Sequence, residues 1–494
     1  MTTLGDAIWG TGREIGTRAI EWAGGAARLE VVLLLAAILG LDSAEKSAVS
    51  AVAGELKQVF GLNNTDIGLL VAASSLVGAL FTLPIGTLVD RLNRKRVVLA
   101  AISLWTIAVV ASGMANSFIM LLVTRMFLGA VTAAAAPTVA SLVGDFFPPE
   151  ERARTYGAIL AGELVGIGLG FSLSGEVSTA LGWRWSFYVL GIPSAAVGLL
   201  IWRFLPEPAR GGQAYIRVGQ EELRSKSQDA AQGTQSENTS PEEVEIRGSI
   251  RNAGVRPRRE LVIHENPASW SIWQTMRYLL RIPTYRLLVL ASALGYFFFA
   301  GVRAFAMIFV TGQYGLTRST ASVLVFVVGF GALIGVIAGG RLSRWLFARG
   351  WLDARVVVPG VALFSAVVLT VPAILTHDAV LGFALLTCGS AFLAAANPPL
   401  DAGRLDIVHA RLWGRAEAGR MTLRGLLEGI APILFGWVSG TFGGGRGLDW
   451  TFLIMLVPVL AASALAIPAR RTYPTDVATA DASARAIAAN ERGR

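Results

Sequence analysis

About twelve long apolar runs divide the chain, and each is long enough to cross a lipid bilayer as a helix. A membrane-spanning helix needs roughly 20 consecutive apolar residues. Of the 494 residues, 53% are hydrophobic and only 16% are charged. The expected spans are 29–55, 66–89, 97–115, 118–144, 153–179, 186–205, 285–312, 319–341, 355–376, 379–402, 417–441 and 450–469. The sequence therefore predicts an all-α membrane protein with twelve transmembrane helices.

The charges of the loops predict how these spans are oriented. Lysine and arginine concentrate in the connections after even-numbered spans, such as 91–96 and 341–355, and are sparse after odd-numbered ones. Short basic loops stay in the cytoplasm, so we expect a multi-pass protein of the inner (cell) membrane with both termini cytoplasmic. The net charge of +9 is then explained by loop cations that face anionic lipid, and no nucleic-acid partner is expected.

The spans fall into two groups of six, which predicts two pseudo-symmetric six-helix bundles at 29–206 and 285–469. The stretch between them, 207–284, is a predicted cytoplasmic linker that is polar and flexible at first. Its later part is amphipathic and is expected to form a helix on the membrane surface. Residues 1–28 are predicted to form an amphipathic segment, with a disordered tail as the alternative, and 470–494 a cytoplasmic tail.

Several functional classes lack the residues they need. The chain has one cysteine, Cys388, so neither a disulfide framework nor a cysteine-based metal site is expected. The three histidines are far apart in sequence, which argues against a zinc site. No phosphate-binding G-x-x-x-x-G-K-[ST] motif is present, which argues against ATP-driven transport. We therefore predict a protein that is not an enzyme, has no cofactor or metal, and is a monomer.

A basic connection between the second and third spans carries a more specific pattern. It reads Gly86-Thr87-Leu88-Val89-Asp90-Arg91-Leu92-Asn93-Arg94-Lys95-Arg96. A positive-inside loop explains the cations but not Gly86 and Asp90 at their spacing. The pattern resembles the signature loop of major facilitator superfamily transporters, and Gly339 to Arg344 echoes it in the second half. The resemblance implies two halves that rock about a midplane site, with Gly86, Asp90, Arg91 and Arg94 in a cytoplasmic gate.

The first span carries charges at bilayer depth, where ionisable residues are costly and mark candidate functional groups. Asp42, Glu45 and Lys46 share one helical face, because they are three and four residues apart. Asp42 and Lys46 can form a local ion pair, which leaves Glu45 uncompensated unless water or another cation reaches it. Alternatively, this face lines a central cavity where Asp42 or Glu45 exchanges a proton. Desolvation favours the protonated form of a carboxyl group, and a nearby cation favours the ionised form.

Two arginines and a glutamate within the expected membrane spans complete the candidate substrate site. Arg125 in span 4 is the natural cation for a span 1 carboxylate or for an anionic headgroup, unless it snorkels near a helix end. Arg303 in span 7 lies among phenylalanines, which suits an amphiphile with an anionic head unless those rings only pack or face lipid. Glu163 lies in a glycine-rich run of span 5, and either faces the cavity or caps a neighbouring helix.

Further charges lie in and before span 11. Arg424 and Glu428 are four residues apart, so we expect them to pair and to contact the signature loop when the cytoplasmic side closes. Asp401, Arg404 and Asp406 are expected to form a solvated cluster at a helix end.

Several separate motifs also resemble the Spinster-like branch of the superfamily, a group of lipid transporters. These motifs are Leu41-Asp42, Val143-Gly144-Asp145-Phe146-Phe147 with Arg152 and Arg154, Trp183-Arg184-Trp185, Pro206-Glu207-Pro208-Ala209-Arg210-Gly211, and Arg415-Ala416-Glu417-Ala418. The resemblance implies that Asp42 responds to protonation and that Asp42, Arg125 and Arg303 meet the lipid headgroup.

The chain also departs from that branch. Ser43 stands where the family has an arginine, and alanines at 133–136 stand where it often has a glutamate. Glu45, or else Glu163, would have to replace that glutamate in proton coupling.

Taken together, the sequence predicts a secondary transporter that moves an amphipathic lipid, of lysophospholipid or sphingoid type, by alternating access with a proton. Its expected partners are a small amphipathic substrate, protons and membrane lipids. A proton-driven exporter of hydrophobic drugs is the alternative, followed by a symporter for a small polar solute. A receptor or scaffold without transport also remains an alternative.

Overall fold

All secondary structure of the computed structural model is helical within the residues that it describes. These are residues 25–91, 94–147, 149–205, 249–250, 253–442 and 447–492, and no strand occurs among them. The part of the predicted amphipathic segment before residue 25 and residues 207–248 and 251–252 of the predicted linker lie outside them. The all-α prediction is confirmed.

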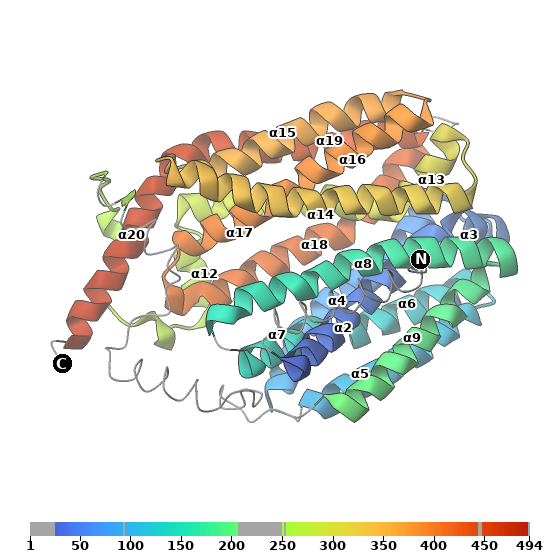
Figure 1. Ribbon diagram of the computed structural model, residues 1–494, viewed down its shortest axis with the longest axis horizontal. Helices are drawn as coiled ribbons and strands as arrows, with labels where there is room; N and C mark the ends of the chain where they lie inside the picture. Colours follow the sequence, from blue (N-terminus) through green and yellow to red (C-terminus); the bar gives the residue numbers. More distant parts are fainter. Residues whose placement is uncertain are drawn as a thin grey trace, which may run out of the picture.

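Within the described residues, twelve helical spans form the bundle, whose arrangement Figure 1 shows. The N-terminal half comprises α2 (Ala26–Ala51) with α3 (Ala53–Phe60), α4 (Asn64–Arg91), α5 (Arg94–Gly113), α6 (Phe118–Thr132) with α7 (Ala135–Phe146), α8 (Pro149–Leu181) and α9 (Trp183–Phe204). The C-terminal half comprises α13 (Pro283–Tyr314), α14 (Arg318–Ala348), α15 (Ala354–Leu375), α16 (Ala379–Ala395) with α17 (Asn397–Asp406), α18 (Trp413–Thr441), and α19 (Gly447–Ala464) with α20 (Ala466–Arg492). Short helices η1 (Arg259–Leu261), η2 (Pro267–Ser269), α12 (Ile272–Leu279) and η3 (Ala410–Leu412) lie between them.

Length and composition agree with this count of spans. In the described part of the chain, ten helical stretches are long and apolar enough to cross a membrane, and Phe118–Thr132 is a shorter apolar helix. The remaining span, α2, carries the charges of residues 42–46. The predicted architecture of twelve transmembrane helices is therefore supported.

Exposed tryptophans mark two levels of the bundle. One end of the bundle, from which α20 projects, is called the α20 end, and the opposite end is called the α3 end (Figure 1). By their positions in the helices, Trp202 near the end of α9, Trp345 and Trp351 around the end of α14, and Trp273 in α12 belong to the α20 end. Trp185 and Trp450 near the beginnings of α9 and α19, and Trp437 near the end of α18, belong to the α3 end. Tryptophan gathers where a bilayer meets water. Along α9, residues 185 and 202 are about 26 Å apart at 1.5 Å per residue, close to the thickness of a hydrocarbon core. The two groups therefore mark the two faces of the membrane.

Glycines set the packing inside each half. In the N-terminal half, a Cβ atom at Gly129 of α6 would lie 2.2 Å from the carbonyl oxygen of Ser74 in α4. In the C-terminal half, a Cβ atom at Gly335 of α14 would lie 1.9 Å from the carbonyl oxygen of Ala391 in α16. The second and fourth spans of both halves thus approach each other through glycine, as small residues permit in membranes. The repeated contact agrees with pseudo-symmetry between the halves.

The two halves contact each other most closely near the α3 end. Between α4 and α18, a Cβ atom at Gly68 would lie 2.1 Å from the carbonyl oxygen of Pro432, and the Asn64 side chain donates to Ser439 Oγ at 2.6 Å. Between α8 and α14, a Cβ atom at Gly168 would lie 2.2 Å from the ring of Phe326. In these pairs α4 and α14 are near their beginnings, whereas α8 and α18 have passed their midpoints. The bundle is therefore closed at the α3 end.

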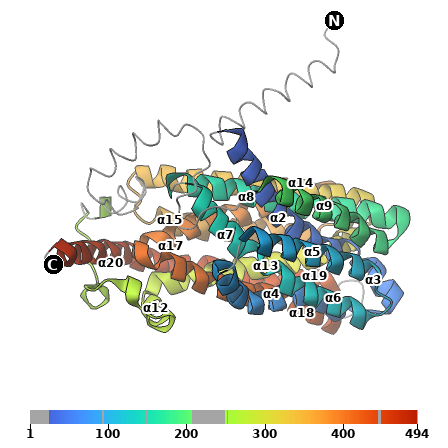
Figure 2. The same ribbon diagram turned by 90° about the horizontal axis from the view of Figure 1, so that it is seen from below.

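The predicted C-terminal tail forms α20, which extends beyond the bundle in both views (Figures 1 and 2). The last part of the predicted linker binds along it. The backbone N–H of Arg258 donates to Thr479 Oγ1 at 2.9 Å, and that of Ile263 donates to Ser483 Oγ at 3.0 Å. The Asp476 carboxylate forms a 3.2 Å ion pair with Arg258. Residues 253–282 and α20 thus form one ordered unit at the base of the C-terminal half.

The expected surface helix corresponds to α12. Ile272 and Trp273 are exposed, whereas Thr275 and Leu279 on the other side are buried. Burial raises the pKa of Tyr278 to about 12, so its neutral hydroxyl donates a hydrogen bond to the carbonyl of Leu261 at 3.0 Å. The amphipathic pattern thus directs one face of α12 onto the protein and leaves an apolar face exposed.

The glycine contact between α2 and α8 yields the first prediction. A Cβ atom at Gly166 would lie 2.0 Å from the carbonyl oxygen of Gly40, so Gly166→Ala should cost about 1–3 kcal/mol of stability through overpacking. Gly295→Ala in α13 is the matched control, because no atom lies within 4 Å of its Cβ position. Thermal unfolding in detergent should show a lower Tm for Gly166→Ala alone. Equal Tm values would contradict the contact.

Candidate functional site

The charges of α2 form two separate ion pairs. Lys46 Nζ lies 2.5 Å from Asp42 Oδ2, one helical turn away. Their side chains are 24% and 18% exposed, so water reaches both. This is the local pair that the four-residue spacing predicted as one alternative.

Glu45 pairs instead with Arg125 of α6. The two side chains are 4% and 1% exposed, and Arg125 also donates to Ser112 Oγ of α5 at 2.6 Å. The Arg125 guanidinium lies 5.0 Å from the ring centroid of Phe187 in α9. Four helices of the N-terminal half thus enclose this pair. Arg125, predicted to contact substrate, is inaccessible in this conformation and fixes α2 to α6.

On the opposing half, α13 presents three residues on one face. Tyr296, Phe299 and Arg303 are three and seven residues apart, a spacing that places them on one helical stripe. The Arg303 guanidinium lies 5.8 Å from the ring centroid of Phe299. Its Nε is buried and has no hydrogen-bond partner among the described residues. A buried donor without a partner is costly, so this nitrogen is suited to an acceptor supplied by a ligand.

The other phenylalanines around Arg303 have a packing role. Phe297, Phe298 and Phe305 are buried and lie with their ring centroids 6.2–6.4 Å from Phe435 of α18. They hold α13 against α18, which is the alternative left open for this cluster. Among the described residues, Phe299 is the aromatic ring that lies against the Arg303 cation.

Arg424 and Glu428 of α18 form the pair that their spacing predicted. Arg424 Nε donates to Glu428 Oε1 at 2.7 Å, and its guanidinium lies 3.4 Å from the ring centroid of Tyr296. Both charged side chains are partly exposed. Sequence reasoning missed Tyr296, although its spacing from Arg303 placed the two on the same face of α13.

Electrostatic interactions connect these pairs across the two halves. Glu428 interacts with Lys46 of α2 and with Arg303 of α13, and Arg424 interacts with Glu163 of α8. We call this set the central charge cluster. It comprises Asp42, Lys46, Glu163, Arg303, Arg424 and Glu428, which are three carboxylates and three cations from four helices. The carboxylates and cations balance, as charges at bilayer depth require.

The charges at the end of α17 are a correction. Arg404 and Asp406, expected in a solvated cluster, are buried. Both oxygens of Asp406 accept hydrogen bonds from Arg355 of α15, at 2.5 and 2.6 Å, and Asp406 also accepts one from Tyr473 of α20. Arg404 pairs with Glu417 of α18. The expectation was wrong for Arg404 and Asp406, because helices distant in sequence, above all α20, cover them. The Asp401 side chain is 44% exposed, as expected, and lies 3.5 Å from Arg420.

The remaining gate residues are described only by their backbone. Helix α4 runs through Gly86 and Asp90 to Arg91, and α5 begins at Arg94. Residues 92–93 and the side chains at 86–91 and 94 lie outside the described part of the chain. Their gate role therefore stays a prediction. Among the described residues, no group of three or more His, Cys, Asp or Glu could hold a metal ion.

Comparison with known proteins agrees with this architecture. The family model described as Major Facilitator Superfamily matches residues 34–402. The fold is similar to the inward-facing, unoccupied crystal structure of a bacterial homolog of the human lysosomal transporter Spinster. The TM-score is 0.72 at 22% identity, over 91% of this chain and 98% of that chain.

Relatives by sequence point to more than one substrate class. The hexuronate transporter of Bacillus subtilis (strain 168) is 22% identical over 436 residues, which cover 84% of this chain and 90% of the relative. Protein spinster homolog 1 of Xenopus laevis is 30% identical over 186 residues, 37% of this chain and 35% of the relative. This chain therefore aligns with about a third of that protein. The resemblance to Spinster-like transporters of the superfamily is confirmed.

The enclosed Glu45–Arg125 pair yields a stability prediction. Glu45→Gln leaves a buried guanidinium without its counter-charge, which should cost about 3–5 kcal/mol. Asp42→Asn is the control, because its partner Lys46 reaches water and the loss should stay below about 1 kcal/mol. Thermal unfolding in detergent would compare the two variants, and Glu45→Gln/Arg125→Gln should regain part of the loss. If Asp42→Asn is the more destabilised variant, the division into enclosed and accessible pairs is wrong.

Proposed function

This chain belongs to the Major Facilitator Superfamily, and we propose that it moves an amphipathic lipid with an anionic headgroup by alternating access. As a member of that family it is a multi-pass membrane transporter and not an enzyme. Lysophospholipids and sphingoid phosphates are the leading substrate class. The observation that carries the proposal is Arg303, whose buried Nε lacks a partner while the aromatic ring of Phe299 lies beside its guanidinium. An anionic oxygen would bind the guanidinium, and the acyl chain would lie against apolar side chains. The Spinster relatives support this class of substrate.

The closed α3 end supports an alternating-access cycle. Contacts at Gly68, Pro432, Gly168 and Phe326 hold the two halves together at that end. In our proposal the central charge cluster lines a substrate cavity that opens toward the α20 end. The bias of basic loops assigns the α20 end to the cytoplasm. The halves then rock about the cluster to open the α3 end.

Proton coupling is proposed to begin at the accessible Asp42–Lys46 pair. Protonation of Asp42 removes the counter-charge of Lys46, whose other electrostatic partner is Glu428 on the opposing half. Lys46 would then pair with Glu428 and draw α2 toward α18. In this proposal Glu45 does not exchange a proton. It stays paired with Arg125, and this enclosed pair keeps α2 attached to α6 throughout the cycle. Arg424 would hold Glu428 when Lys46 returns to Asp42.

Transport at varied pH tests the proton step. Asp42→Asn should transport a labelled lysophospholipid in proteoliposomes at a rate that no longer depends on pH, because Lys46 has lost its titratable partner. Arg485→Gln on α20 is a control that should keep the wild-type pH profile. An unchanged pH profile in Asp42→Asn would exclude Asp42 as the coupling site.

A second assay tests Arg303 as the headgroup site. Arg303→Gln should lower the affinity for an anionic lysolipid about 10- to 100-fold, the value of a hydrogen bond to a charged group, and leave a cationic dye unaffected. Arg349→Gln is the matched control, because Arg349 lies over Trp345 at the α20 end, away from the cluster. Equal loss for the lipid and the dye would assign Arg303 a structural role.

The same panel distinguishes the alternatives. Movement of the dye with the proton gradient, and no movement of lipid, would indicate an exporter of hydrophobic drugs. A labelled hexuronate belongs in the panel, because the hexuronate transporter aligns with most of this chain. Transport of hexuronate alone would indicate a carrier of small organic anions. Binding of lysolipid without transport of any solute would favour a receptor.

A further inference from the structure

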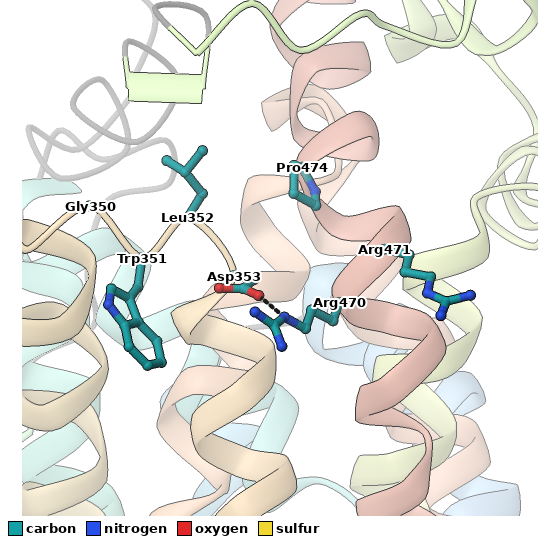
Figure 3. Close-up of a pocket in the computed structure, with 7 residues that line it drawn as sticks. All are labelled: Gly350, Trp351, Leu352, Asp353, Arg470, Arg471 and Pro474. Atoms are coloured by element: carbon teal, nitrogen blue, oxygen red, sulfur yellow. Dashed lines mark hydrogen bonds and ion pairs between the residues drawn. The ribbon is translucent and has the colours of Figure 1, made fainter.

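A second candidate site lies away from the central charge cluster, at the α20 end of the C-terminal half. It is a crevice of about 630 Å³ between the loop that joins α14 to α15 and the first turns of α20 (Figure 3). The loop contributes Gly350, Trp351, Leu352 and Asp353, and α20 contributes Arg470, Arg471 and Pro474. None of these residues belongs to the proposed transport pathway.

The crevice lies at the depth of lipid headgroups. Trp351 belongs to the group of exposed tryptophans that marks the membrane face at this end. Arg470 and Arg471 follow the last residue of the apolar helix α19, Ala464, by only six and seven residues. Tryptophan and arginine at such positions contact the interfacial region of a bilayer. The crevice therefore opens where phospholipid phosphates are abundant.

The charges of the crevice favour an anion. Its lining residues include two arginines and one carboxylate, so the net charge is positive. The Arg470 guanidinium lies beside Asp353, whereas the Arg471 side chain leaves the other side of α20 (Figure 3). Arg470 uses Nε to pair with Asp353, and its side chain stays 64% exposed, so its terminal nitrogens remain accessible (Figure 3). Arg471 is exposed and has no ion-pair partner among the described residues. Basic pockets at the membrane surface bind the headgroups of anionic lipids.

We propose that this crevice binds the headgroup of an anionic phospholipid, with its phosphate at the exposed nitrogens of Arg470, the charge of the neighbouring Arg471 adding to the attraction, and its glycerol portion toward Trp351. The bound lipid would join the α14–α15 loop to α20. This inference goes beyond the proposed transport function and does not depend on it, because the lipid is a resident of the surrounding bilayer and is not carried.

Lipid retention by the purified protein tests the proposal. Native mass spectrometry in detergent would compare bound phosphatidylglycerol with phosphatidylcholine of the same acyl chains. The wild type should retain one molecule of phosphatidylglycerol in preference to phosphatidylcholine. Arg470→Gln/Arg471→Gln should weaken its binding roughly 30-fold, since each arginine near a membrane surface contributes about a factor of five. Arg471→Gln alone breaks no ion pair among the described residues and should give part of this loss in a fully folded protein.

The matched control is Arg485→Gln. Arg485 lies on the same helix, pairs with Asp481 at 2.9 Å and is 59% exposed, but it lies about 22 Å farther along α20. The Arg485→Gln variant should retain as much phosphatidylglycerol as the wild type. The proposal is overturned if Arg485→Gln loses as much lipid as the double variant, if the double variant loses none, or if excess inorganic phosphate displaces the lipid.

Asp353→Asn separates an anionic headgroup from a zwitterionic one. If the crevice takes an anion, removing the carboxylate frees Arg470 and should strengthen phosphatidylglycerol binding. If Asp353 instead binds the amine of phosphatidylethanolamine, this variant should lose phosphatidylethanolamine and gain no phosphatidylglycerol. The second result would overturn the assignment to anionic lipid.

Discussion

The cost of placing charge in hydrocarbon governs the arrangement of this protein. Several pairs of opposite charges lie where helices of the bundle meet, and these pairs differ in how far they are exposed. Glu45–Arg125 and Arg355–Asp406 are enclosed, and each connects helices within one half. Asp42–Lys46 and Arg424–Glu428 stay partly exposed and lie close to each other across the two halves. Enclosed pairs thus keep each half rigid, and accessible pairs remain able to exchange partners.

Small residues provide the complementary constraint. Glycine at positions such as 166 and 335 lets the backbones of neighbouring helices come into direct contact, which a side chain there would prevent. The distance between α2 and α8, for example, is fixed by backbone contact at Gly40 and Gly166. The same device joins the halves at the α3 end. Close backbone contact and charge compensation therefore determine the fold together.

Local patterns in the sequence predicted the fold well. Apolar run length predicted the spans, and helical spacing predicted the pairs Asp42–Lys46 and Arg424–Glu428. The pairing of Glu45 with Arg125 was harder, because 80 residues separate them and two carboxylates competed for one cation. The burial of Asp406 was missed, since its partner Tyr473 lies in a segment whose composition predicted only a tail. Contacts between distant segments depend on topology, which spacing within one helix does not report.

The contacts at the α3 end have a further consequence. The described contacts that join the halves there involve glycine, proline, phenylalanine, serine, threonine and asparagine, all of them uncharged. Interactions of this kind are not screened by dissolved ions, whereas exposed ion pairs are. Ionic strength should then leave the contacts of the α3 end unaffected and act chiefly on the charged α20 end. The two ends of the molecule would differ in their sensitivity to the salt content of the compartment each one faces.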